Sequence, residues 1–168
     1  MDSRTNLPTS SANFFAGKKY VNNKNEEIAF DYGAKISIIG LFFTGSWCPP
    51  CEKFAQELIE VYNDSNSKEK VIEIIQVSNE KNEKEFAEGI SDKPWIFVPY
   101  GDHFIDYLVN EYKVTQLPVL LVVRKDRNLI SDTGRRDVAE NGVKVHEKWL
   151  KVYKVQKERE REISSTHN

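Results

Sequence analysis

A nearly continuous run of β-branched and aromatic residues, from Lys35 to Phe43, leads into the only two cysteines of the chain. Such a run is typical of a strand buried on both faces in the middle of a sheet. Pro49 and Pro50 follow where a helix would begin, because a missing N–H costs least at that point. The sequence therefore predicts a strand-to-helix turn that carries Cys48 and Cys51.

The rest of the chain alternates strand and helix periodicities. Short apolar runs predict strands at residues 71–78, 119–123 and 128–131, and a polar turn between apolar segments predicts a hairpin within 18–30. Amphipathic stripes predict helices at 49–64, 79–90 and 103–114, and a closing helix from 143. This alternation indicates an α/β fold with a central mixed β-sheet flanked by α-helices.

Length and composition fit a single domain with its own hydrophobic core. The chain has 168 residues, of which 39% are hydrophobic and 30% charged. We expect a flexible polar arm over residues 1–13, the domain over 14–155 and a charged C-terminal tail over 156–168.

The charge balance bears on the class of partner. The net charge is -2, so the chain has no overall positive field to attract nucleic acid or anionic lipid. No run approaches the roughly 20 apolar residues of a membrane helix, and the N-terminus lacks a signal-peptide pattern. The sequence predicts no nucleic-acid partner, no membrane partner and a cytoplasmic location, with a nuclear or organellar association as the alternative.

A close cysteine pair allows three interpretations: a redox dithiol, an inert buried pair, or half of a zinc site. Zinc would need two further ligands, but His103, His146 and His167 lie far apart in the sequence, so we expect no metal. At a helix start, unpaired N–H groups and the helix dipole favour the thiolate. In the redox interpretation Cys48 is the nucleophile and Cys51 the resolving thiol.

Several spaced motifs resemble the thioredoxin fold, and specifically its tryparedoxin and nucleoredoxin branch. The Trp-Cys-Pro-Pro-Cys segment at residues 47–51 is the first, and the segments at 77–102, 111–123 and 132–142 follow in the order expected of that branch. The resemblance covers roughly residues 14–150. It implies a thiol-disulfide oxidoreductase that reduces protein disulfides without a cofactor, with disulfide-containing proteins or small dithiol or glutathione-type reductants as partners.

The resemblance also implies a substrate-binding surface around the dithiol. Pro118 matches a cis proline that faces the cysteines, and the residue before it would pair with an extended substrate chain. Trp47 would offer an apolar contact, with a plain core Trp as the alternative, and a structural role competes with contact for Trp95. The implied contact residues are Trp47, Pro49, Pro50, Trp95, Leu117 and Pro118.

Three positions depart from the family pattern or are ambiguous. Phe42 occupies the place where most thioredoxins have a buried Asp, so water or another group, such as Glu80, would move the proton. Glu52 stands where a basic residue is usual, and it would disfavour a Cys48 thiolate and repel anionic partners. Arg135 would be a solvated or salt-bridged loop residue.

A second interpretation, from a different functional class, is a thioredoxin-like interaction module within a larger assembly. In that case the charged helix from Val145 would dock on a neighbouring protein, with little or no turnover at the cysteines.

Overall fold

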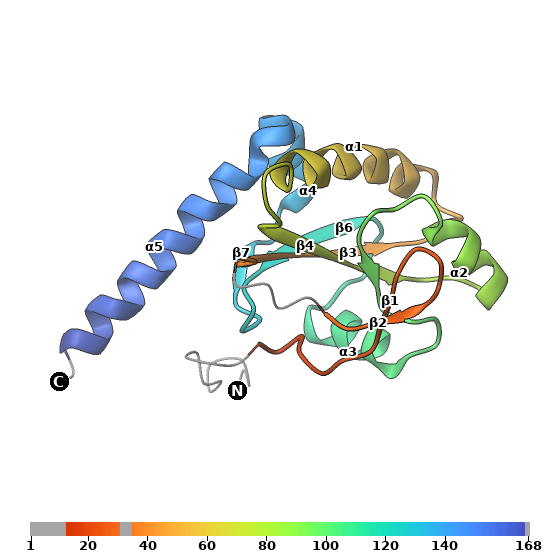
Figure 1. Cartoon of the computed structure of the whole chain (residues 1–168), viewed down its shortest axis with the longest axis horizontal. Coiled ribbons are helices and arrows are strands. Elements are labelled where there is room, and N and C mark those ends of the chain that lie inside the picture. Colours follow the sequence, from red (N-terminus) through yellow and green to blue (C-terminus); the bar gives the residue numbers. More distant parts are fainter. Residues whose placement is uncertain (1–12, 31–34, 167–168) are drawn as a thin grey trace.

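The structure is a computed structural model that describes residues 13–30 and 35–166, so the expected arm, except for Asn13, lies outside the described residues. Within these residues, strands form one mixed sheet in the order β2-β1-β5-β4-β3-β6-β7 (Figure 1). The predicted α/β class with a central mixed sheet is confirmed. The strands are β1 (Tyr20–Val21), β2 (Glu27–Ile28), β3 (Ile38–Thr44), β4 (Ile72–Ser78), β5 (Ile96–Phe97), β6 (Val119–Val123) and β7 (Leu129–Ser131).

Strand β3 is an interior strand of the sheet, between β4 and β6, and is buried along its whole length. It runs parallel to β4 and antiparallel to β6. Its side chains alternate between two cores: Phe42 lies in the core on one face, and Leu41 and Phe43 lie in the core on the other. The unbroken apolar run in the sequence exists because both faces of this strand are covered.

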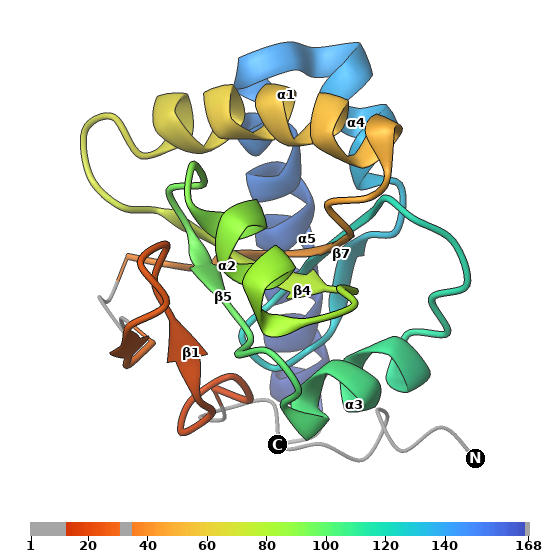
Figure 2. The same cartoon turned by 90° about the vertical axis from the view of Figure 1, so that its right-hand side faces the viewer.

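Helices cover both faces of the sheet, as Figure 2 shows with α1 and α4 on one side and α3 on the other. None of the described helices is long and apolar enough to cross a membrane. The helices are α1 (Pro49–Ser65), α2 (Glu83–Ile90), α3 (His103–Glu111), α4 (Gly134–Asn141) and α5 (Val145–Thr166).

Two elements were absent from the sequence prediction. Strand β5 has only two residues, which is too short for a periodicity to appear. Helix α4 replaces the loop expected around the Gly-Arg segment. Its first residue, Gly134, packs so close to β6 that a Cβ there would lie 2.5 Å from the carbonyl oxygen of Leu120. The glycine that suggested a loop instead allows a helix to start against the sheet.

Helix α5 continues through the boundary expected at residue 155 and extends away from the domain (Figure 1). Contacts beyond that boundary tie it to the sheet. Glu160 pairs with the buried Arg124 at the end of β6, and the Gln156 amide donates to the carbonyl oxygen of Leu129 in the edge strand β7. A strand edge needs such cover, because its unpaired backbone groups otherwise invite other strands.

A buried carboxylate joins β7, α4 and α5. Asp137 is 2% exposed and accepts hydrogen bonds from the hydroxyls of Ser131 and Thr133, the Lys148 ammonium and the Trp149 indole N–H. Burial alone would raise the pKa of Asp137, but these hydrogen bonds outweigh it and hold the pKa below its usual value. The ionised form therefore stabilises the fold.

We predict that Asp137→Asn lowers the free energy of unfolding by about 2 to 4 kcal/mol at neutral pH, since a charged acceptor of four hydrogen bonds is lost. The difference between the native protein and the variant should persist above the ordinary carboxyl pKa of 3.8 and shrink as the pH falls below it. Urea denaturation at several pH values in this range measures the free energy of unfolding of the native protein and of the variant. Asp132→Asn, at an exposed neighbouring position, is the control, and an equal effect of the two substitutions would contradict the prediction.

Candidate active site

The two cysteines lie at the junction between β3 and α1. Cys48 is the N-cap residue of α1, and its carbonyl oxygen accepts the backbone N–H groups of Cys51 and Glu52. A disulfide joins the two cysteines, whose Cα atoms are 5.2 Å apart. Cys48 is 6% exposed and Cys51 is fully buried, so Cys48 is the less buried of the two residues. Pro49 and Pro50 open the helix, as predicted, and are exposed.

The loop before Cys48 is attached to the end of β4. The Trp47 indole N–H donates to the carbonyl oxygen of Asn79 at 2.7 Å, and the Glu80 carboxylate accepts both the N–H and the hydroxyl of Ser46. Gly45 is required here, because a Cβ would lie 2.7 Å from the Trp47 nitrogen. Trp47 is nevertheless 54% exposed, so it presents an apolar surface beside the cysteines and is not a core residue.

Glu80 therefore anchors the loop through Ser46 and is not simply a solvated acid at a helix start. Burial raises the pKa of Glu80, and the two hydrogen bonds from Ser46 oppose that rise. Its role in moving a proton stays a prediction. A signal for its position was present in the sequence: Asn79 and Glu80 directly follow β4, and the carboxyl ends of parallel strands meet at one edge of a sheet.

The proline segment reaches the same edge because β6 is antiparallel to β3. The first residue of β6, Val119, is paired with Phe43 near the end of β3, which places the preceding loop beside the cysteine turn. The Leu117–Pro118 peptide bond is cis, as the resemblance implied. Pro118 is buried and Leu117 is half-buried.

Arg135 lies on the first turn of α4, so the loop setting expected for it is wrong. Its guanidinium is 3.5 Å from the carbonyl oxygen of Pro118 and lies over the Phe54 ring, 5.7 Å from the ring centre. The side chain thus connects the proline segment to α1, and it is exposed.

Trp95 does not contribute a contact surface. It is 2% exposed, its indole N–H donates to the Gln76 side chain at 2.9 Å, and its ring packs edge-on against Phe42. The structure therefore supports the structural alternative for Trp95. Phe42 and this Trp fill the same core.

The described residues contain no cluster of His, Cys, Asp and Glu that could hold a metal ion. The dithiol instead stands alone at a helix start, with an exposed Trp, a half-buried Leu and a cis proline around it. This arrangement suits thiol-disulfide exchange, which needs an accessible sulfur, a second sulfur within reach and room for a partner chain.

Comparison with known proteins identifies the family. A family model described as thioredoxin-like matches residues 36–129. The chain belongs to the thioredoxin-like family. A probable nucleoredoxin 1 of Arabidopsis thaliana is 36% identical over 117 residues, which is 68% of this chain but 20% of that protein. The aligned region is thus a small part of the curated relative.

Comparison with solved structures gives the same thioredoxin-like fold. Thioredoxin from Wuchereria bancrofti superposes with a TM-score of 0.70 at 29% identity, covering 83% of this chain and 98% of that one. Tryparedoxin II from C. fasciculata gives a TM-score of 0.67 at 25% identity, covering 82% and 90%. The predicted thioredoxin-like fold of the tryparedoxin and nucleoredoxin branch is confirmed.

Within this thioredoxin-like site, sequence reasoning missed the partner of Glu52. The Lys93 ammonium is 3.0 Å from the Glu52 carboxylate, and it also contacts Asp92 and the carbonyl oxygen of Gly89. Lys93 is only 3% exposed. The Lys93 cation, in the turn after α2, thus offsets part of the negative charge that Glu52 brings to the dithiol. Because Lys93 is far from Glu52 in the sequence, no sequence pattern indicated this pair.

We predict that the Lys93–Glu52 pair sets the thiol pKa of Cys48 in the reduced protein. Lys93→Met leaves Glu52 unpaired and should raise that pKa by about half a pH unit, whereas Glu52→Gln should lower it by a similar amount. Thiolate absorbance followed against pH measures the change. Lys84→Met, at an exposed site on α2, is the control. Shifts of the same sign in both variants would contradict the prediction.

Proposed function

We propose that this chain is a thiol-disulfide oxidoreductase that reduces protein disulfides, with Cys48 as nucleophile and Cys51 as resolving thiol. The observation that carries the proposal is the Cys48–Cys51 pair at the start of α1, with Cys48 the less buried residue of the two. Membership of the thioredoxin-like family supports it. Because the chain spans only part of its curated relatives, their full activities do not transfer to it.

The proposed reaction has two exchange steps. The Cys48 thiolate attacks one sulfur of the substrate disulfide, forming a mixed disulfide and releasing the other substrate sulfur as a thiolate that takes up a proton. The Cys51 thiolate then attacks the Cys48 sulfur, which releases the second substrate thiol and forms the Cys48–Cys51 disulfide. The substrate gains two electrons, and an external dithiol or glutathione-type reductant returns them to the protein.

The environment assigns a role to each neighbouring group. The positive end of the α1 dipole favours a thiolate at Cys48 over one at Cys51. We propose that the exposed Trp47 and the half-buried Leu117 offer apolar contact to the substrate, together with Pro118, Pro49 and Pro50. Glu80 orients the loop through Ser46 and is the ionisable group that we propose for proton transfer.

The reductant is proposed at the level of chemical class. A tryparedoxin II has been solved in complex with glutathionylspermidine, and at 23% identity that likeness concerns the fold alone. Reduction of disulfides fits a reducing compartment, so we propose a cytoplasmic location.

We expect the protein to accelerate insulin reduction by dithiothreitol, seen as turbidity when the insulin B chain precipitates. Cys48→Ser should reduce the rate to that of dithiothreitol alone, because the attacking sulfur is gone. Circular dichroism of the variant controls for folding. A native protein that is folded and gives no acceleration would overturn the proposed reaction.

We also expect Cys51→Ser to accumulate mixed disulfides with substrate proteins, since the second exchange step needs the resolving thiol. The adducts should disappear on reduction and should be absent from the double variant Cys48→Ser/Cys51→Ser. Adducts formed equally well by Cys48→Ser, which keeps only Cys51, would reverse the assigned roles.

A second function, as an interaction module within a larger assembly, is favoured by one observation. The outer part of α5 extends away from the domain and carries Val155 and Ile163, which are 51% and 58% exposed (Figure 1). Stoichiometric co-purification with a complex that survives the loss of both cysteines but not truncation after residue 154 would support this function.

A further inference from the structure

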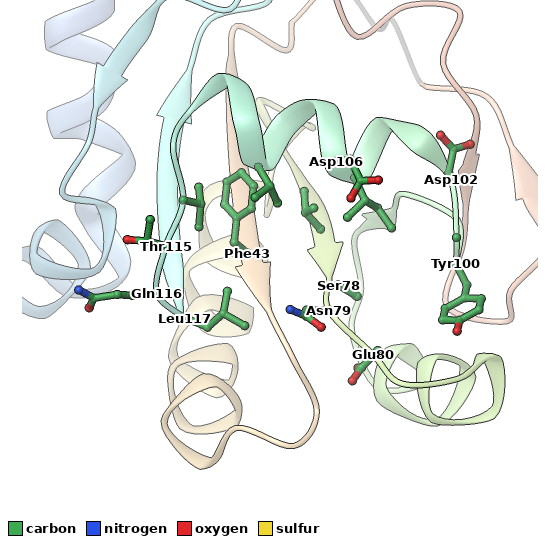
Figure 3. A pocket seen from close by; sticks show the side chains of 15 residues that line it. Phe43, Ser78, Asn79, Glu80, Tyr100, Asp102, Asp106, Thr115, Gln116 and Leu117 are labelled. Carbon is green, nitrogen blue, oxygen red and sulfur yellow. The ribbon is translucent and has the colours of Figure 1, made fainter.

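A pocket opens beside the proline segment, on the face of the sheet opposite α1. It has a volume of about 440 Å³, within the range of sites that bind small ligands or side chains. Figure 3 shows it between α3 and the ends of β3 and β4, with Leu117 at one end. Leu117 also precedes Pro118, so the pocket continues from the cysteine site already described.

The floor of the pocket is apolar. Phe43 and Val77, near the ends of β3 and β4, line it from the sheet, and Ile105 and Val109 line it from α3. Phe43 and Val77 belong to the core of this face, and the two α3 residues pack against that core. An apolar side chain entering the pocket would therefore lose water without meeting an unpaired polar group of the floor.

The rim on the α3 side is acidic. Asp102 caps α3, and Asp106, one turn further on, shares its side of the helix, so both carboxylates border the pocket. Among the described residues, the Asp102 carboxylate accepts only the backbone N–H of Phe104 and has no ion pair, and the Asp106 carboxylate has neither a hydrogen bond nor an ion pair. Among the described residues that line the pocket there is no Lys, Arg or His. The rim thus has negative charge that a cationic ligand would balance.

The backbone at the other end of the pocket is open for pairing. Gln116 and Leu117 make no backbone hydrogen bond to any other described residue, although β6 begins two residues after Leu117. Free N–H and C=O groups in line with a strand accept an extended chain by strand addition. This feature points to a polypeptide occupant and not to a small molecule.

We propose that this pocket binds the segment of the substrate protein next to its reacting cysteine, and that it selects a segment carrying an Arg or Lys. The substrate backbone pairs with Gln116 and Leu117, as the resemblance already implies for the residue before Pro118. The new element is the selection: an apolar side chain enters the pocket, and the cation meets Asp102 and Asp106. Arg suits this rim best, because its planar guanidinium donates to two carboxylates at once. This inference rests on the proposed function for its choice of substrate, but the binding itself needs no redox step.

Binding is tested first without chemistry, on the full chain with Cys48→Ser/Cys51→Ser. The probes are labelled peptides with one Ser in place of cysteine, one Leu and an alanine background, in which a single Arg occupies each flanking position in turn. Each has a partner with citrulline, which has the shape of Arg without its charge. Fluorescence anisotropy gives the dissociation constants.

We expect at least one Arg peptide to bind about three- to tenfold more tightly than its citrulline partner at low salt. That ratio should approach one in about 0.5 M salt, where charges are screened within a few ångströms. Asp102→Asn/Asp106→Asn should remove most of the ratio. Asn is itself a good helix cap, so α3 is retained, and circular dichroism checks this.

The matched control is Glu83→Gln/Glu88→Gln, which removes two exposed carboxylates from α2 and should keep the ratio. If no Arg peptide exceeds its citrulline partner, or if both double variants reduce the ratio equally, the pocket assignment is overturned. The proposed reaction is tested separately. A protein that binds an Arg peptide more tightly than its citrulline partner but does not accelerate insulin reduction would overturn the reaction and not the pocket assignment.

Discussion

The pairing of β3 with its two neighbours is the constraint on which the site depends. Its parallel pairing with β4 brings Ser78 beside Thr44, so the Asn79–Glu80 segment meets the loop that leads to Cys48. Its antiparallel pairing with β6 brings Val119 beside Phe43, so Pro118 arrives from the other side. A slip of either register would move these segments and turn their side chains to the other face. The chemistry of the dithiol therefore depends on hydrogen bonds made several residues before it.

Polar contacts around the cysteine pair cross between elements. Glu52 on α1 meets Lys93 after α2, and Glu80 after β4 meets Ser46 before α1. These contacts connect the cysteine turn to its neighbours, and the Lys93 cation offsets part of the negative charge of Glu52 and Asp92. Asp102 and Asp106 lie at α3 and border a pocket that Glu80 also lines. The charges at the cysteine turn bear on thiol reactivity, and the carboxylates at α3 bear on the proposed partner selection.

Much of the fold was predictable, because it rests on patterns longer than a few residues. The runs that became β3, β4 and β6 show strand patterns, and the stripes of α1 and α3 have helical periodicity. The misses have local causes. β5 has only two residues. α4 starts at Gly134, which allows the helix to pack closely against Leu120, and this contact is evident only once the sheet has formed. For Trp95 the sequence left a partner contact open beside a structural role, and its position between Phe42 and Gln76 buries it.

The sequence by itself determined that a buried strand leads into a helix at a cysteine pair, since apolar patterning and the position of two prolines are properties of neighbouring residues. It also placed that pair in the thioredoxin-like family. Only the tertiary structure decided which charges meet: that Lys93 offsets Glu52, that Glu80 holds Ser46, and that Asp102 and Asp106 border a pocket ending at Leu117. The physical reason is that Coulomb interactions and hydrogen bonds depend on distances in space, and these follow from strand register and helix packing across segments far apart in the chain.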